Sequence, residues 1–161
     1  MKVYIEDIAD KMEVTDEEWI VFLNRNTGEI VEIGQEYYSI AEGLREDEEI
    51  PAHLTEWEKE DVQTAIEIVE NWEDYLELPN QHDIHEYSIM EDFIESITDN
   101  RKSAVLYQAI NGKGAFRRFK DKLYDLELED SWFAYKYAAY CKIAVRWCEE
   151  SEISYAFKSR K

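Results

Sequence analysis

Glycine and proline interrupt this chain so rarely that long helices are the regular structure it can form most easily. Its 161 residues include only five glycines and two prolines. These residue types mark turns and end helices, so their scarcity predicts few tight turns. Hydrophobic residues make up 45% of the chain, which supplies a packed core despite the many charges. We therefore expect one folded domain over residues 1–161.

A hairpin signal near the N-terminus adds a β component. Trp19–Leu23 is β-branched and aromatic, Asn24–Gly28 has the residues of a turn, and Ile30–Ile33 resumes the strand pattern. These segments predict an antiparallel hairpin over about residues 18–33. Tyr75–Leu78 alternates before Pro79 and is a candidate third, edge strand. A similar alternation over Ile153–Phe157 predicts a short terminal strand.

The helical part of the chain is expected over about residues 55–150. Thr55 followed by Glu58 forms the capping-box pattern that begins a helix. Asp83 followed by Glu86 repeats that pattern, and a helix from about Asn100 should stop at Asn111-Gly112. A last helix runs from about Asp130 to Glu150. The sequence therefore predicts an α+β fold, a mostly helical single domain with a small N-terminal antiparallel hairpin or three-stranded sheet.

The charge of the chain is large and unevenly distributed. The formal net charge is −20. Residues 1–100 contain 30 acidic and 5 basic residues, whereas residues 101–161 contain 8 acidic and 13 basic residues. Such segregation of acidic and basic residues indicates binding to a charged partner, or docking of one part of the chain on the other, and does not indicate a particular fold. A strongly acidic chain repels nucleic acid and acidic lipid at long range, so such a partner would need a local basic patch.

One basic segment combines several features of an anion site. Two glycines flank a lysine, a helix is expected to open at the second glycine, and two arginines follow. The candidate ligand-binding residues are Gly112, Lys113, Gly114, Arg117, Arg118 and Lys120. We expect Phe116 and Phe119 to dock this helix onto the C-terminal helix. The segment has neither the P-loop spacing nor the dinucleotide fingerprint. The alternative is structural, with the bases lying against the chain's own acids.

The sequence contains no recognisable catalytic constellation, and no catalytic residue and no cofactor are expected. His82, His85 and Glu86 are the only cluster of metal-ligand types, but required partner ligands are missing and a helix-capping role is favoured. Cys141 and Cys148 are seven residues apart in a helical segment, too far to form a disulfide. Two unpaired thiols fit a reducing compartment.

These observations leave three functional interpretations open. The first is a non-enzymatic binding module whose basic helix contacts a phosphate-bearing small molecule, RNA or another acidic ligand. The second is an acidic interaction or regulatory domain that binds a basic protein. A hydrolase or transferase is the weakest of the three. The N-terminus turns acidic too early for a signal peptide, and no apolar run approaches membrane-spanning length. A cytoplasmic protein without membrane partners is therefore expected.

Several segments together resemble a known family. They are Leu78-Pro79 running into Asp83–Phe93, the block Gly-Lys-Gly-Ala-Phe-Arg-Arg-Phe-Lys at residues 112–120, the ending Trp147–Glu150, the hairpin, and the stretch from Ile50-Pro51 to Trp57-Glu58. In these segments the chain resembles an uncharacterised family of bacterial cytosolic proteins, one of the UPF groups. The resemblance spans most of the chain and implies a single bacterial domain. It implies no reaction, ligand or partner.

Overall fold

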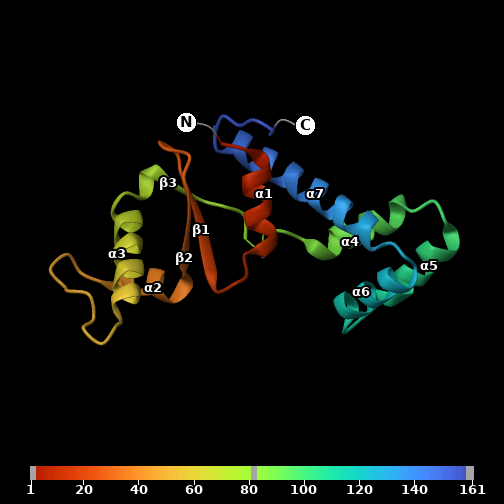
Figure 1. Ribbon diagram of the computed structural model, residues 1–161, viewed down its shortest axis with the longest axis horizontal. Coiled ribbons are helices and arrows are strands. Elements are labelled where there is room, and N and C mark those ends of the chain that lie inside the picture. The colour runs from red at the N-terminus through yellow and green to blue at the C-terminus, as the bar shows by residue number, and fades with distance from the viewer. Residues whose placement is uncertain (1–2, 81–82, 159–161) are drawn as a thin grey trace. The chain divides into compact units, whose positions relative to one another are not determined.

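The computed structural model describes residues 3–80 and 83–158, and their contacts divide the chain into two compact units. Unit 1 contains the residues up to Asp83 and those from Ile143 onward, and unit 2 contains Ile84–Lys142. Helices dominate, and a small antiparallel sheet lies in unit 1 (Figure 1). The predicted α+β class is confirmed.

Unit 1 holds the sheet and its covering helices. Its elements, apart from the end of the last helix, are α1 (Ile5–Val14), β1 (Trp19–Asn24), β2 (Ile30–Gly34), α2 (Gln35–Gly43), α3 (Glu56–Glu70), the 3-10 helix η1 (Trp72–Asp74) and β3 (Tyr75–Glu77). The strand order is β2-β1-β3, with both pairings antiparallel. The predicted hairpin and third strand are therefore confirmed, and β3 lies at an edge, where a following proline interrupts no ladder.

The hairpin turn is stabilised by a side chain that accepts hydrogen bonds from backbone amides. Asn24 Oδ1 accepts hydrogen bonds from the amides of Asn26 (2.9 Å) and Thr27 (3.2 Å). Gly28 then adopts a φ of 78°, a conformation that costs glycine little. The turn sets the register in which Phe22 faces Val31 and Leu23 faces Ile30.

Two helices pack against the sheet and against each other. Ile20, Phe22 and Ile33 from the strands form a core cluster with Ala65 and Ile68 of α3, joined by Ala41 of α2. The sequence did not predict α2. The capping box of α3 is present: Thr55 Oγ1 accepts from the Glu58 amide at 3.3 Å, and the Glu58 carboxylate accepts from the Thr55 amide at 3.0 Å.

The end of the chain returns to the start of α1. Ala156 and Tyr4 form a parallel bridge, in which the amide of Ile5 donates to the Ala156 carbonyl at 3.0 Å and the Ala156 amide donates to the Val3 carbonyl at 2.9 Å. The prediction of a terminal strand over Ile153–Phe157 was wrong in extent, because these residues form a single bridge rather than a strand.

Unit 2 is a helical assembly centred on aromatic side chains. It contains α4 (Glu86–Ser96), α5 (Asn100–Ala109), α6 (Ala115–Asp125) and the greater part of α7 (Glu129–Glu150), whose last turns belong to unit 1. The Phe119 ring of α6 lies 4.9 Å from Trp132 of α7 and 6.4 Å from Phe93 of α4, both edge-on. Edge-to-face geometry suits the charge distribution of aromatic rings.

Two local predictions about the helices of unit 2 need correction. Phe116 was expected to dock α6 together with Phe119, but Phe116 is 48% exposed and Phe119 only 2%. The buried stripe of α6 is Ala115, Phe119 and Leu123, four residues apart, and Phe116 falls beside it. Asp83 was expected to cap α4, but the N-cap residue is His85, and the Asp83 carboxylate accepts from the Asn80 amide instead.

The two phenylalanines of α6 provide a matched test of this packing. Phe119→Ala should lower the free energy of unfolding by about 3–5 kcal/mol, as for a buried Phe that leaves a cavity. Phe116→Ala should change it by less than about 1 kcal/mol, because much of that ring already contacts water. Urea denaturation of both variants measures the difference. Equal losses would show that α6 is not packed through Phe119.

Candidate functional site

The basic segment forms the turn between α5 and α6. Gly112 and Gly114 both have a φ of 78°, in the left-handed region, and Gly114 is the N-cap residue of α6. The two glycines reverse the chain between the helices, as the glycine-flanked sequence predicts. Both candidate glycines therefore have a defined backbone role in this turn.

Arg118 is bound to the turn itself. Its Nε donates to the Ala109 carbonyl at 2.8 Å, and its two terminal nitrogens donate to the carbonyls of Asn111, at 2.5 Å, and Lys113. The guanidinium thus satisfies carbonyls at and beyond the end of α5, which have no partner within a helix. Because Arg118 makes these three hydrogen bonds, it stabilises the loop and has fewer N–H donors left for a ligand. We did not anticipate this arrangement from the sequence.

The other basic candidates are exposed. Lys113, Arg117 and Lys120 all lie at the surface. Within the described residues of unit 2, the ion pairs are Lys122–Asp125 at 3.8 Å and Lys136–Glu86 at 3.0 Å, and neither involves these three side chains. Their charges are accordingly not neutralised by carboxylates of their own unit.

The weak metal candidates are not brought together. His85 is exposed, Glu86 pairs with Lys136, and His82 lies outside the described residues. In the part of the chain that the structure describes, no group of three or more His, Cys, Asp or Glu side chains could hold a metal ion. Cys148 is buried, and burial raises the pKa of its thiol to about 11, so it is held as the less reactive neutral form.

A pocket in unit 1 gathers aromatic and acidic side chains that the sequence does not place together. Its volume is about 650 Å³. Trp19 begins β1, Tyr37 lies in α2 and Trp57 opens α3, and all three line it. Trp19 is 44% exposed and Trp57 59%. Four carboxylates share the lining, and no lysine or arginine does: Glu17, Glu18, Glu36 and Asp61.

We call this the aromatic–acidic pocket, and its Tyr37 side chain is held by several contacts. Its ring meets Trp57 edge-on at 5.9 Å, and its hydroxyl donates to Glu58 Oε2 at 3.0 Å. A methyl group on Gly34 would lie 3.0 Å from the Tyr37 ring, so glycine permits this close approach. Because Glu58 is fixed by the capping box of α3, the pocket's wall is pre-ordered by the same bonds that start the helix.

The pKa values of Tyr37 and Glu58 keep the first as a hydrogen-bond donor and the second as an acceptor. Burial, the hydrogen bond to Glu58 and neighbouring carboxylates raise the pKa of Tyr37 to about 12. The backbone hydrogen bond from Thr55 is the largest influence that lowers the pKa of Glu58. At neutral pH the phenol is therefore protonated and the carboxylate is charged, as their hydrogen bond requires. The pocket thus presents a neutral aromatic surface edged by negative charge.

Comparison with protein-family models matches residues 1–160 to the Uncharacterised protein family (UPF0158). The chain belongs to this family. The resemblance identified from the sequence is confirmed at this level, whereas a bacterial source and the diagnostic value of the Gly-Lys-Gly block stay predictions. No curated protein and no solved structure gives a significant match. Among the described helices of this UPF0158 member, none has the length and apolar character needed to cross a bilayer.

The two glycines of the α5–α6 turn allow the role of Arg118 to be measured. Gly112→Ala should cost about 1–2 kcal/mol, because a side chain disfavours the left-handed backbone but meets no atom within 4 Å. Gly114→Ala should cost about 1 kcal/mol more, because the added carbon lies 2.9 Å from an Arg118 nitrogen and displaces its hydrogen bonds.

A double-mutant cycle provides the control for this prediction. In an Arg118→Ala background, the two glycine substitutions should have equal cost, because the displaced group is gone. Urea denaturation measures all the variants. An excess cost at Gly114 that persists without Arg118 would contradict the interpretation.

Proposed function

We propose that this UPF0158 member is a non-enzymatic binding domain whose aromatic–acidic pocket accepts a cationic group of a basic partner protein. The observation that carries this proposal is the convergence of Trp19, Tyr37 and Trp57 with four carboxylates in one pocket. Aromatic faces attract cations, and the attraction reaches about 2 kcal/mol where water is excluded. An arginine or lysine side chain can lie over such rings while its charge faces the acids.

The net charge of the chain supports the same partner class. A formal charge of −20 attracts a basic partner over distances comparable to the Debye length, about 10 Å at 0.1 M salt. Such steering raises the rate of encounter, whereas short-range contacts decide which groups remain bound. In the pocket these contacts come from the rings, of which Tyr37 is held by its edge-on contact with Trp57 and by its hydrogen bond to Glu58.

An exposed tryptophan outside the pocket makes the proposal testable with a matched control. The probe is a short arginine-rich peptide, acetylated and amidated so that it carries no terminal charge. Trp57→Ala should weaken its binding about 2- to 30-fold, which corresponds to one cation–π contact. Trp72→Ala removes a tryptophan that is 70% exposed in η1 and should leave the affinity unchanged. Calorimetric titration at low salt measures both variants.

Peptide binding must also depend on the carboxylates of the aromatic–acidic pocket. Glu36→Gln with Asp61→Asn should weaken binding and reduce its dependence on salt, since fewer charges then face the peptide. Equal affinity of the wild type, the Trp57 variant and the Trp72 variant would overturn the proposal. Peptide binding to unit 2 alone, detected by NMR amide shifts, would overturn it as well.

The basic surface of α6 supports a second candidate function, contact with a phosphate group. Its support is the exposure of Lys113, Arg117 and Lys120 without ion pairs in their own unit. Because Arg118 is engaged by three carbonyls, Arg117 is the guanidinium that is available for a two-pronged contact with a phosphate. Gly112, Gly114 and Arg118 would then shape the turn that presents these cations.

Titration at low salt with inorganic phosphate, a nucleotide and a short RNA tests this second candidate. Amides between residues 112 and 120 should shift, and Arg117→Ala should weaken binding more than Lys120→Ala. Lys142→Ala, an exposed cation of α7, serves as the control. If none of those amides moves at millimolar ligand, the basic segment does not bind phosphate.

A further inference from the structure

One edge of the three-stranded sheet has backbone hydrogen-bonding groups that point away from the sheet. The strand order is β2-β1-β3, so β2 has a neighbouring strand on one side only. At the two ends of the hairpin, the Asn24 amide donates to the Glu29 carbonyl at 2.9 Å and the Gln35 amide donates to the Glu18 carbonyl at 2.7 Å. Both bonds continue the β1–β2 register. In an antiparallel pair such bonds occur at every second residue, so the odd-numbered residues of β2 face β1.

The even-numbered residues of β2 direct their backbone groups outward: Ile30, Glu32 and Gly34. In the described part of the chain, none of their three amides donates a hydrogen bond, and no group donates one to the carbonyls of Ile30 and Glu32. The neighbouring helices cover the two faces of the sheet: Ile33 packs with α3, whereas Glu32 pairs with Lys11 of α1 at 2.6 Å. Figure 1 shows α3 and α1 on opposite sides of the sheet. This edge is therefore able to pair with a further strand.

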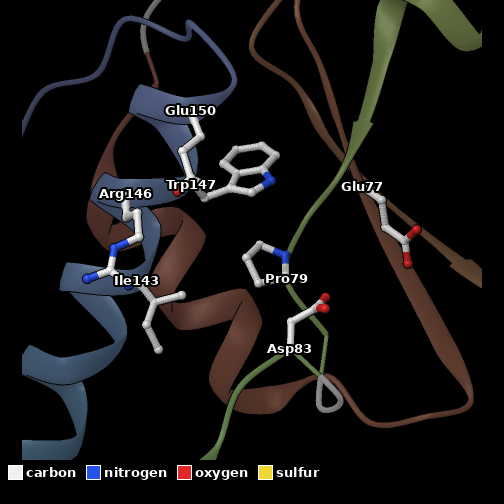
Figure 2. A pocket seen from close by; sticks show the side chains of 7 residues that line it. All are labelled: Glu77, Pro79, Asp83, Ile143, Arg146, Trp147 and Glu150. Atoms are coloured by element: carbon white, nitrogen blue, oxygen red, sulfur yellow. The ribbon is translucent and has the colours of Figure 1, made fainter.

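The opposite edge of the sheet is less suited to another strand. β3 has only three residues, and Pro79 follows it after one intervening residue. Proline has no amide proton to donate, and Figure 2 shows the Pro79 ring directed toward α7, in a pocket that Trp147 also lines. A short strand and a nearby proline are common protections of an exposed edge. β2 has five residues and no proline, so it lacks this protection.

We propose that the outer edge of β2 binds an extended segment of the basic partner protein as a fourth strand. The class of partner rests on the proposed function, and the fourth strand adds how that partner is held. β2 leads directly into the aromatic–acidic pocket, because Gly34 ends the strand and lines the pocket with Gln35 and Glu36. A segment paired with β2 can therefore place an arginine or lysine side chain at the pocket, while its backbone bonds to the outward groups of Ile30 and Glu32.

The charge around β2 favours a basic segment over a second copy of this chain. Glu29 and Glu36 flank the strand, and both are exposed. Within the described residues neither takes part in an ion pair, whereas Glu32 is paired with Lys11. Two β2 edges paired with each other would bring these acidic ends of two chains together, at a net charge of −20 each. A basic segment instead gains from the same carboxylates.

Two peptides with N-methylated backbones test the proposal on the unchanged protein. The parent is an acetylated and amidated hexapeptide, one arginine followed by alternating threonine and valine, which favour extended structure. One derivative carries N-methyl groups at its even positions and the other at its odd positions, so each lacks the amide donors along one edge. One derivative should bind about 10-fold more weakly than the other, because only one edge of the peptide faces β2. Calorimetric titration measures all three peptides.

Amide hydrogen exchange locates the bound peptide on the sheet. The parent peptide should slow exchange at Ile30, Glu32 and Gly34 about 10-fold or more, whereas Val31 and Ile33, which already face β1, should change little. Ile30→Pro removes one outward amide and no bond to β1, so it should weaken binding more than Ile30→Ala, which controls for the lost side chain. A melting curve verifies that both variants fold.

Three results would count against the fourth strand: no binding of the parent peptide at millimolar concentration, equal affinity of the two methylated peptides, or unchanged exchange along β2 with saturating parent peptide. The aromatic–acidic pocket would still stand if Trp57→Ala weakened binding of the arginine-rich peptide. Conversely, slowed exchange along β2 with no effect of Trp57→Ala on either peptide would retain the fourth strand and reject the pocket. The two proposals therefore fail separately.

Discussion

Keeping every carboxylate in contact with water is the constraint on which this structure depends. The chain has 38 acidic residues, and in the described residues no charged or polar side chain is buried. Desolvating an unpaired carboxylate would cost more than most single contacts return, so the core has to be built from apolar side chains alone. Six of the acids lie in the first turns of α1, α3 and α7. There the partial positive charge of the helix end stabilises them, typically by about 0.3–1 kcal/mol each at an exposed site.

The basic side chains are used differently from the acidic ones. Arg118 makes three hydrogen bonds to carbonyls around the end of α5, so its charge holds a loop. This assigns a structural role to one of the two arginines that made the segment appear to be an anion site. Arg117, one residue earlier, points to a different side of α6 because successive helical residues differ by about 100°. The same short segment therefore contains a loop anchor and a solvent-exposed cation.

Local patterns predicted the elements well, because hydrogen bonds between near neighbours determine them. The hairpin follows from Asn24 and Gly28, and the start of α3 follows from Thr55 and Glu58. Helix α2 was missed because it begins directly after β2 with no side-chain cap and buries only Ala41. Its periodic signal is therefore weak. The exposure of Phe116 was missed for another reason: two residues three apart both fit an apolar face, and packing against Trp132 and Phe93 decides which one is buried.

The aromatic–acidic pocket could not have been predicted from the sequence, since its residues come from segments far apart in the chain. Trp19 and Trp57 are separated by a hairpin and a helix, and only the packing of α2 and α3 on the sheet brings them to one pocket. An acidic chain attracts many cations through its net charge, and that long-range attraction does not distinguish between them. Discrimination has to come from short-range contacts, such as those with the rings of Trp19, Tyr37 and Trp57 in the aromatic–acidic pocket.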